Sequence, residues 1–288
     1  MTGTMRKAED VVAIIGVRGF GLPCARRLGR GRRLLIGDVS AEILRVAEAE
    51  LTGEGYDVTS CQIDVAEPDS VRAFAERVPR LGRLNSVLLT AGVSPRMAPP
   101  ERIFAINMLG AIQVMGAFLP LAQPGTVAVL IASSAAYMAP VPAEVERELA
   151  LAAPESLIDA VRGVVGADTS LGAYWLAKRC NQLRVEAAAP IWGRRGARIL
   201  TVSPGLISTA MVAFEREAGA PVDEAIASTP AGRIGVPDDI AAAVEWLVGP
   251  EASYITGTDI LIDGGMTSAI RWTGALTEDP RDRNRQVS

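Results

Sequence analysis

Tyr174 and Lys178 are the residues whose types and spacing first suggest chemistry. Four positions apart on a helix, two side chains share one face and can reach the same bound molecule. A phenol has an ordinary pKa of about 10 and transfers protons poorly at neutral pH, but a neighbouring ammonium group stabilises the phenolate. The pair is therefore a candidate for proton transfer, although this spacing alone more often means a half-buried ring beside a solvated amine.

The composition limits which other groups can do acid/base work. The chain has 288 residues and no histidine, which excludes a His-based triad and a His-ligated zinc site. Its cysteines, Cys24, Cys61 and Cys180, lack metal-ligand or redox spacing, and their odd number argues against a disulfide framework. Proton transfer must fall to tyrosine, lysine or carboxylates, and we expect no bound metal.

Charge and hydropathy bear on partners and location. The net charge is −4, so no global field attracts nucleic acid or anionic lipid. Residues 1–10 are polar and lack the apolar stretch of a signal peptide, and we expect no segment with the apolar length of a membrane span. We therefore expect a cytoplasmic protein without nucleic-acid or membrane partners.

Short β-branched runs alternate with longer amphipathic segments from Val11 onward, which is the pattern of βαβ units around a parallel sheet. The expected strands are 11–16, 33–37, 57–63, 85–91, 125–132, 197–202 and 258–262, and the expected helices lie near 22–30, 40–53, 67–78, 101–119, 172–189 and 238–248. The sequence thus predicts an α/β fold in one domain, a three-layer, doubly wound (Rossmann) parallel sheet of seven strands, with its core at 11–265.

Two regions and the C-terminal end depart from this alternation. Prolines punctuate residues 138–170, which we interpret as a helical insertion before the helix of Tyr174. Residues 206–232 read as a helix-poor connection of the kind that forms lids. Residues 266–288 grow polar and charged and are expected to form a tail.

A glycine turn and an acidic residue indicate a nucleotide. Residues 16–21, Gly-Val-Arg-Gly-Phe-Gly, lie between an expected strand and helix, where glycine lets a pyrophosphate approach the backbone at a positive helix N-terminus. Asp38 ends the next strand, where a carboxylate accepts from ribose hydroxyls and repels a 2′-phosphate, which favours NAD. Arg18 favours NADP instead, because a guanidinium pairs with that phosphate. Asp38 has a second interpretation as a helix N-cap, a role that Ser40 can also fill.

These landmarks, taken in order, resemble the short-chain dehydrogenase/reductase family across about residues 11–265. The resemblance rests on the glycine turn, Asp38, Asp64-Val65, Thr90-Ala91-Gly92, Asn107, Ser133, Tyr174 with Lys178, Ser203-Pro204-Gly205, and the C-terminal segments 232–240 and 255–265. Chance agreement of such an ordered set is remote.

The resemblance implies a role for each matching residue. Tyr174 would be the general acid/base, Lys178 would lower its pKa and hold the nicotinamide ribose, and Ser133 would hold the substrate oxygen. Asn107 would seat a water that relays protons to Lys178; otherwise it is a buried polar residue that needs partners. The expected cofactor-binding set is Gly16, Arg18, Gly19, Phe20, Gly21, Asp38, Val39, Asp64, Val65, Thr90, Ala91, Gly92, Tyr174, Lys178, Pro204, Gly205, Ile207 and Thr209.

The sequence departs from the family pattern in four places. Two residues rather than three separate Gly16 from Gly19, and Leu89-Thr90 replaces the paired asparagines before Ala91. Ser134 is the alternative to Ser133 as the substrate-binding serine. About forty residues separate this serine from Tyr174, and we expect the 138–170 insertion to cover the substrate cleft.

The leading hypothesis is an NAD-dependent oxidoreductase that interconverts a secondary alcohol and a ketone. The alternatives are a dehydratase or epimerase that retains NAD, and a non-catalytic nucleotide-binding sensor or assembly protein. Apolar residues in the insertion favour a small hydrophobic substrate. The apolar helices 101–119 and 172–189 and the family resemblance suggest a homodimer or homotetramer, with burial against the sheet as the other explanation of the same pattern.

Overall fold

The computed structural model describes residues 9–139, 141–164 and 166–272. Of the expected tail, residues 273–288 lie outside the described ranges, and so do residues 1–8 of the N-terminal segment.

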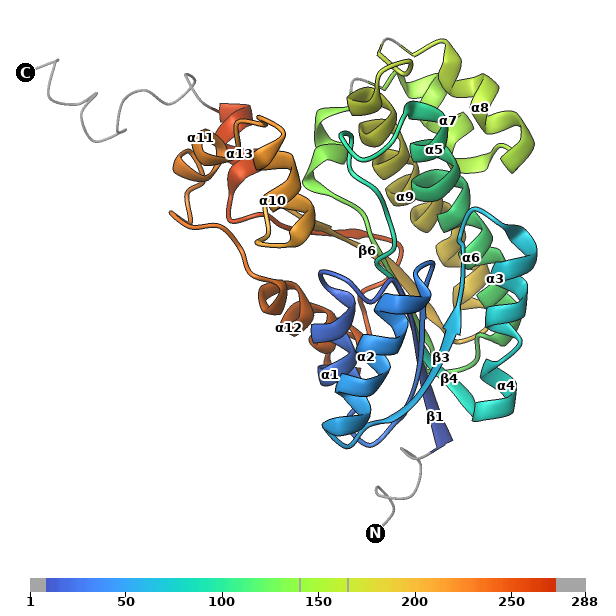
Figure 1. Ribbon diagram of the computed structural model, residues 1–288. Helices are drawn as coiled ribbons and strands as arrows, with labels where there is room; N and C mark the ends of the chain where they lie inside the picture. The colour runs from blue at the N-terminus through green and yellow to red at the C-terminus, as the bar shows by residue number, and fades with distance from the viewer. Residues whose placement is uncertain (1–8, 140, 165, 273–288) are drawn as a thin grey trace, which may run out of the picture.

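A seven-stranded parallel sheet forms the centre of the protein (Figure 1). The strands follow the order β3-β2-β1-β4-β5-β6-β7, which reverses direction at β1 and β4 as in a doubly wound fold. Their bounds are β1 (Asp10–Ile15), β2 (Arg33–Asp38), β3 (Asp57–Gln62), β4 (Arg83–Leu89), β5 (Val127–Ile131), β6 (Arg198–Pro204) and β7 (Asp259–Ile262). Each predicted strand overlaps an observed one, and the predicted fold class is confirmed.

Helices cover both faces of this sheet. One face carries α1 (Gly21–Leu28), α2 (Ala41–Gly53) and α12 (Pro237–Val248); the other carries α3 (Pro68–Ala75), α4 (Val78–Leu81), α6 (Gly110–Phe118) and α9 (Ser170–Gly193). In the fully buried β1, Val11 and Ala13 pack into the α3–α6–α9 side, whereas Val12 packs into the α1–α12 side. Successive residues of β1 therefore pack alternately into two separate cores, as a parallel strand covered on both faces requires.

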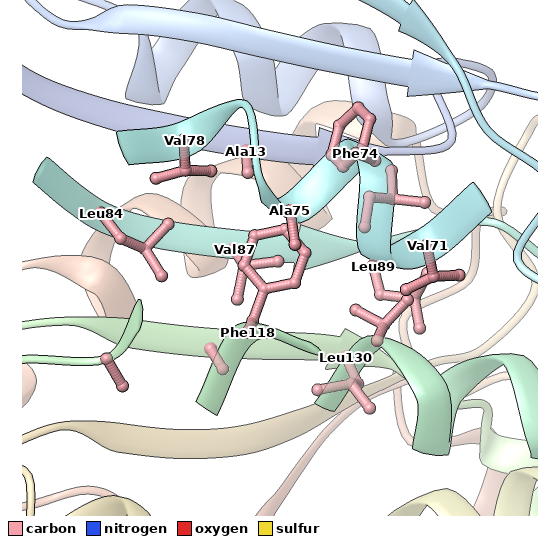
Figure 2. Packing of buried hydrophobic residues seen from close by; sticks show 14 of the residues in the cluster. Ala13, Val71, Phe74, Ala75, Val78, Leu84, Val87, Leu89, Phe118 and Leu130 are labelled. Carbon is pink, nitrogen blue, oxygen red and sulfur yellow. The ribbon is translucent and has the colours of Figure 1, made fainter. Parts of the chain in front are cut away.

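Aromatic and aliphatic side chains fill the core on the α3–α6 side (Figure 2). The rings of Phe74 and Phe118 lie with their centroids 6.4 Å apart, in a tilted pair between the helices and the strands. Figure 2 shows Val87, Leu89 and Leu130 beneath them, projecting from β4 and β5. The core thus fixes α6, and with it the helical run that carries Asn107, against the sheet.

The run Pro100–Leu121 contains α5 (Pro100–Ile103), a π-helical stretch η2 (Phe104–Leu109), α6 and a short η3 (Leu119–Leu121). By length and composition alone it qualifies as a membrane span, so the expectation that no segment would do so is wrong. Of its most apolar window, 44% is buried inside the protein, where the run packs against α3 and α9. A buried core helix passes the same test, because its apolar residues face other protein elements.

The predicted insertion forms two helices, α7 (Ala143–Leu151) and α8 (Pro154–Arg162), preceded by a 3₁₀ turn η4 (Ser134–Met138). A third core joins them to α5, η2 and α9, and includes Leu149, Leu157 and Cys180, all without exposed surface. Arg184 on α9 donates from Nε to the carbonyl oxygen of Leu149 at 2.6 Å, and Arg179 pairs with Glu146 at 2.6 Å.

The insertion reaches the surroundings of the predicted site, since Tyr174 itself packs against this third core. On α9, Lys178 and Gln182 turn toward the sheet, with partners on β5 and β6. Leu176 and Leu183, which belong to the third core shared with the insertion, lie on roughly the opposite side of the helix. Figure 1 shows α7 and α8 grouped with α5 and the first turns of α9. The apolar residues that suggested subunit contacts in 172–189 are therefore partly explained by burial within the chain, against both the sheet and the insertion.

The connection 206–232 is richer in helix than predicted, since it contains α10 (Ala210–Glu217) and α11 (Val222–Ala227). Thr209 caps α10 by accepting from the backbone N–H of Val212 at 3.4 Å. After η5 (Pro250–Ala252) and β7, the first residues of the expected tail form a further helix, α13 (Met266–Trp272). Figure 1 shows α10, α11 and α13 grouped on the opposite side of the strand ends from α5, α7 and α8.

Candidate active site

Tyr174 and Lys178 lie on successive turns of α9, as the spacing predicted. The helix is capped by Thr169, whose hydroxyl accepts from the N–H of Gly172 at 3.0 Å. Lys178 is buried, and its Nζ donates to the carbonyl oxygen of Ile131 at 2.9 Å and lies 5.7 Å from the centroid of the Tyr174 ring. Burial lowers the pKa of Lys178 to about 8, because the ammonium has lost solvation without gaining a carboxylate partner.

The phenol of Tyr174 meets Ser133, which follows β5. Burial raises the pKa of Tyr174, the hydrogen bond with Ser133 acts in the opposite direction, and the charge of Glu215 raises the pKa further. Ser133 itself accepts a hydrogen bond from the N–H of Ala135 at 3.1 Å, which fixes its hydroxyl at the start of η4. The structure thus brings Ser133 to Tyr174, while the alternative, Ser134, lies buried within η4.

Asn107 lies in the π-helical stretch η2, and its side-chain amide hydrogen-bonds to the backbone of Val93. Its Nδ2 donates to Val93 O at 2.8 Å, and its Oδ1 accepts from Val93 N at 2.9 Å. Its own carbonyl oxygen accepts from Nδ2 of Asn181 at 3.0 Å. The side chain therefore matches the interpretation of a buried polar group that needs partners, and it anchors the segment that follows β4.

Gly92 lies against both the side chain of Asn107 and that of Lys178. A Cβ at Gly92 would lie 3.0 Å from Oδ1 of Asn107 and 3.7 Å from Nζ of Lys178. Ala91, beside it, donates its N–H to the carbonyl oxygen of Ile15 at 2.9 Å. The ends of β1 and β4, η2 and α9 thus meet at one point, the carboxyl edge of the sheet where doubly wound folds bind ligands.

The backbone of the glycine turn packs so closely on neighbouring backbone that only glycine fits. Gly16 has φ +95°, and a Cβ there would lie 2.5 Å from Ala91 N and 2.6 Å from Oγ1 of Thr90. A Cβ at Gly21 would lie 2.0 Å from Gly16 O. Thr90 donates its hydroxyl to Gly16 O, so this residue, which stands where the family has asparagine, ties the end of β4 to the turn.

The rest of the turn leads into α1. Phe20 occupies the N-cap position without a side-chain cap, and Arg18 is exposed. A Cβ at Gly19 would lie 3.6 Å from Cγ2 of Thr209, so two predicted cofactor residues from distant segments are neighbours. The open N-terminus of α1 and the side-chain-free turn fit a dinucleotide pyrophosphate.

Asp38 links the turn to the start of α2. Its carboxylate accepts from the N–H of Val17 at 3.2 Å and from the N–H of Ser40 at 3.1 Å. Ser40 is the N-cap of α2, accepting from Ile43 N, so the cap interpretation belongs to Ser40. The neighbouring Val39 is exposed, and its carbonyl accepts from Gln62. Asp38 is thus held at the end of β2 with its charge beside the glycine turn.

The predicted adenine-side pair divides into a charged and an apolar residue. Asp64 accepts from the N–H of Ala66 at 2.9 Å and pairs with Arg102 at 3.2 Å. Val65 is buried against Gly110, where a Cβ would lie 2.9 Å from Cγ2 of Val65. Arg102 carried no signal in the sequence, because its partner is 38 positions away.

The remaining predicted residues line the end of β6. Gly205 donates to Ile262 O at 2.9 Å, and a Cβ there would lie 2.7 Å from Cα of Asp263, so Pro204-Gly205 packs directly on β7. Ile207 is buried and pairs with Gly235 in a parallel bridge. Thr209 follows as the cap of α10. These contacts place the 204–209 segment between the glycine turn and the α10–α11 pair.

Two charged residues near the site were not anticipated. Glu215 on α10 pairs with Arg96, which follows β4. Its negative charge acts to raise the pKa of Tyr174. Nothing local in the sequence marks either residue. Within the described ranges, no group of three or more cysteines and carboxylates is arranged to hold a metal ion.

Two protein-family models match the chain. A family model described as short chain dehydrogenase matches residues 10–145, and a second, described as Enoyl-(Acyl carrier protein) reductase, matches residues 156–267. The interval between the two matches falls within the insertion.

Similar proteins share nearly the full length of the chain. A short-chain dehydrogenase/reductase, bsc3, of Alternaria brassicicola is 36% identical over 264 residues, covering 90% of this chain and 96% of its own. The 3-alpha-hydroxysteroid dehydrogenase/carbonyl reductase of Comamonas testosteroni is 28% identical, covering 83% and 95%. The crystal structure of levodione reductase has a TM-score of 0.75 at 26% identity, covering 92% and 100%.

Proposed function

Since the chain belongs to the short-chain dehydrogenase/reductase family, we propose that it is an NAD(H)-dependent oxidoreductase that interconverts a secondary alcohol and a ketone. The observation that carries the proposal is the meeting of Tyr174, Ser133 and Lys178 at the carboxyl edge of the sheet, beside the glycine turn. Relatives named as dehydrogenases and reductases support a net redox reaction over the cofactor-retaining and non-catalytic alternatives.

The chain's own residues account for the proton transfer. Ser133 lies at the phenol, where its hydroxyl can hold the oxygen of a substrate carbonyl or alcohol. Because burial keeps Tyr174 protonated at neutral pH, its phenol donates a proton to a ketone oxygen in reduction and must accept one in oxidation. Lys178 stabilises the phenolate by its positive charge. A bound nicotinamide supplies or accepts the hydride.

The glycine turn would hold the pyrophosphate and Asp38 the adenosine ribose. We propose NAD rather than NADP because the Asp38 carboxylate is fixed beside the turn by Val17 and Ser40, where a 2′-phosphate would meet its negative charge. Arg18 is exposed and is the residue that would favour NADP.

We further propose a small hydrophobic alcohol or ketone as substrate and a cytoplasmic homodimer or homotetramer as the working form. The substrate proposal draws on relatives whose names refer to hydroxysteroids and to levodione. Size measurement by multi-angle light scattering tests the assembly separately from activity.

The decisive experiment combines binding and turnover. Equilibrium titration with NADH and NADPH should show tighter NADH binding, and a panel of ketones with NADH should give a substrate whose reduction consumes NADH stoichiometrically. Tyr174→Phe should then lose turnover by about 10²–10⁴-fold while retaining NADH binding. Full activity in Tyr174→Phe would refute the assignment, and consumption of substrate without net NADH oxidation would favour a dehydratase or epimerase.

A further inference from the structure

A polar layer lies between α9 and the strands β6 and β7. Successive residues of a strand point to opposite faces, so Ile199, Thr201 and Ser203 share the face of β6 that is turned toward α9. Ile199 belongs to the apolar core on that side. Thr201 and Ser203 are equally buried, but they present hydroxyl groups toward the carboxyl end of the strand. The apolar core under α9 therefore gives way to polar groups as the strand approaches the candidate active site.

The carboxylate of Asp259, at the start of β7, accepts the hydroxyl groups of this layer. Its Oδ1 accepts from the hydroxyl of Thr201 at 2.6 Å and from that of Ser203 at 2.8 Å. Its Oδ2 accepts from the phenol of Tyr137 at 2.7 Å. Three hydroxyl groups thus converge on one carboxylate, and bonds to an ionised acceptor are stronger than bonds between neutral groups.

The same layer extends to the helix that carries Tyr174. Nε2 of Gln182, about two turns after Tyr174 on α9, donates to Oγ of Ser203 at 3.1 Å. Oε1 of Gln182 accepts from Nη1 of Arg179 at 2.9 Å, and Arg179 pairs with Glu146 on α7. Apolar packing has no direction, whereas a satisfied network of buried hydrogen bonds specifies one arrangement. The layer therefore fixes the register of α9 against β6.

Tyr137 ties the other half of the candidate site to the layer. It lies on η4, the short turn whose N-cap is Ser133. Partial burial and the hydrogen bond to Asp259 raise the pKa of Tyr137, so its phenol keeps the proton that it donates. The segment that bears Ser133 and the helix that bears Tyr174 are therefore both connected to Asp259.

We infer that Asp259 is a positioning residue for the proposed reaction. It holds η4 through Tyr137, and it holds α9 through the hydroxyl groups of β6. The two attachments set how the hydroxyl of Ser133 meets the phenol of Tyr174. Because displacing reacting groups by about 1 Å can cost about a hundredfold in rate, fixing both segments to one carboxylate favours turnover. The inference rests on the proposed function, since it assigns Asp259 a part in that reaction.

Removing one hydroxyl group tests the attachment of η4. Tyr137→Phe keeps an exposed ring and should fold normally, but kcat for ketone reduction should fall about tenfold to a hundredfold while the NADH dissociation constant stays unchanged. Tyr56→Phe is the matched control, because the phenol of Tyr56 donates at 2.8 Å to the carbonyl oxygen of Arg26, in the last turn of α1. The control should leave kcat unchanged. Unchanged kcat in Tyr137→Phe, or equal losses in the two variants, overturns the inference.

A double substitution tests whether Tyr137 acts through Asp259. Asp259→Ala should lower kcat at least as far as Tyr137→Phe does, because it releases β6 as well as η4. The variant with both substitutions should then be no slower than Asp259→Ala alone, since the two residues share one interaction. Losses that multiply would mean that Tyr137 contacts the substrate directly, which overturns the inference. The comparison of Tyr137→Phe with its control stands even if Asp259→Ala does not fold.

A spectroscopic measurement tests the positioning without requiring turnover. The chain has four tyrosines, so ¹³C labelling of tyrosine Cζ gives four signals, and Tyr174→Phe identifies the signal of Tyr174. That signal should shift in Tyr137→Phe and in Asp259→Ala, because the surroundings of the phenol change, and it should stay in place in Tyr56→Phe. An unchanged Tyr174 signal in Tyr137→Phe overturns the inference even if the enzyme proves active. Inactivity of the whole ketone panel, with the expected shifts present, would count against the proposed function and leave the positioning by Asp259 supported.

Discussion

Gly16→Ala tests whether the shortened glycine turn is as closely packed as the structure shows. Alanine at φ +95° costs about 1–2 kcal/mol, because the left-handed region crowds Cβ. The new Cβ would lie 2.5 Å from Ala91 N, which cannot withdraw without weakening the 2.8 and 2.9 Å bonds from Thr90 N and Ala91 N to Ile15 O. Losing one or two such bonds adds about 1–2 kcal/mol. The variant should lose about 3 kcal/mol of stability.

Gly55→Ala is the matched control. Gly55 has φ +90°, and a Cβ there would meet nothing within 4 Å. It should therefore show the conformational cost alone, and the difference between the two variants measures the contact with Thr90 and Ala91. Denaturant unfolding and thermal scans give the stabilities, with Tm expected about 6–12 °C lower for Gly16→Ala. NADH titration should show weaker binding only in Gly16→Ala. Equal stability losses in the two variants, with NADH binding intact, would refute the reasoning.

Three further predictions concern the insertion, the buried lysine and the cofactor carboxylate. Leu149→Ala should cost about 2–5 kcal/mol in denaturant unfolding, because this side chain is fully buried, whereas Leu151→Ala, at an exposed position of the same helix, should be nearly neutral. Burial lowers the pKa of Lys178 from 10.5 to about 8, so the unfolded chain binds more protons between these values. The unfolding free energy of the protein relative to Lys178→Met should therefore rise across that pH range, and a flat difference would contradict it. Asp38→Ala should weaken NADH binding about tenfold or more and reduce discrimination against NADPH, measured by parallel titrations.

The sequence by itself determined the architecture, because the relevant signals are local. Short β-branched runs separated by amphipathic segments can bury their apolar residues only in a parallel sheet covered on both faces. The glycine turn, Asp38, and the Tyr174–Lys178 spacing each lie within a few residues of one element. Their common location follows from the rule that parallel strands meet at one carboxyl edge.

Only the tertiary structure decided how these residues are held. The hydroxyl of Thr90 replaces an absent asparagine by reaching the carbonyl of Gly16, 74 positions away. The insertion packs on α5 and α9, because its apolar side chains share one core with theirs. The side-chain amide of Asn107 bonds to the backbone of Val93, and Glu215 meets Arg96 from α10, a helix that the sequence pattern did not reveal. Each depends on contacts between distant segments, and the local periodicity of a chain carries no information about which distant partner a polar side chain meets.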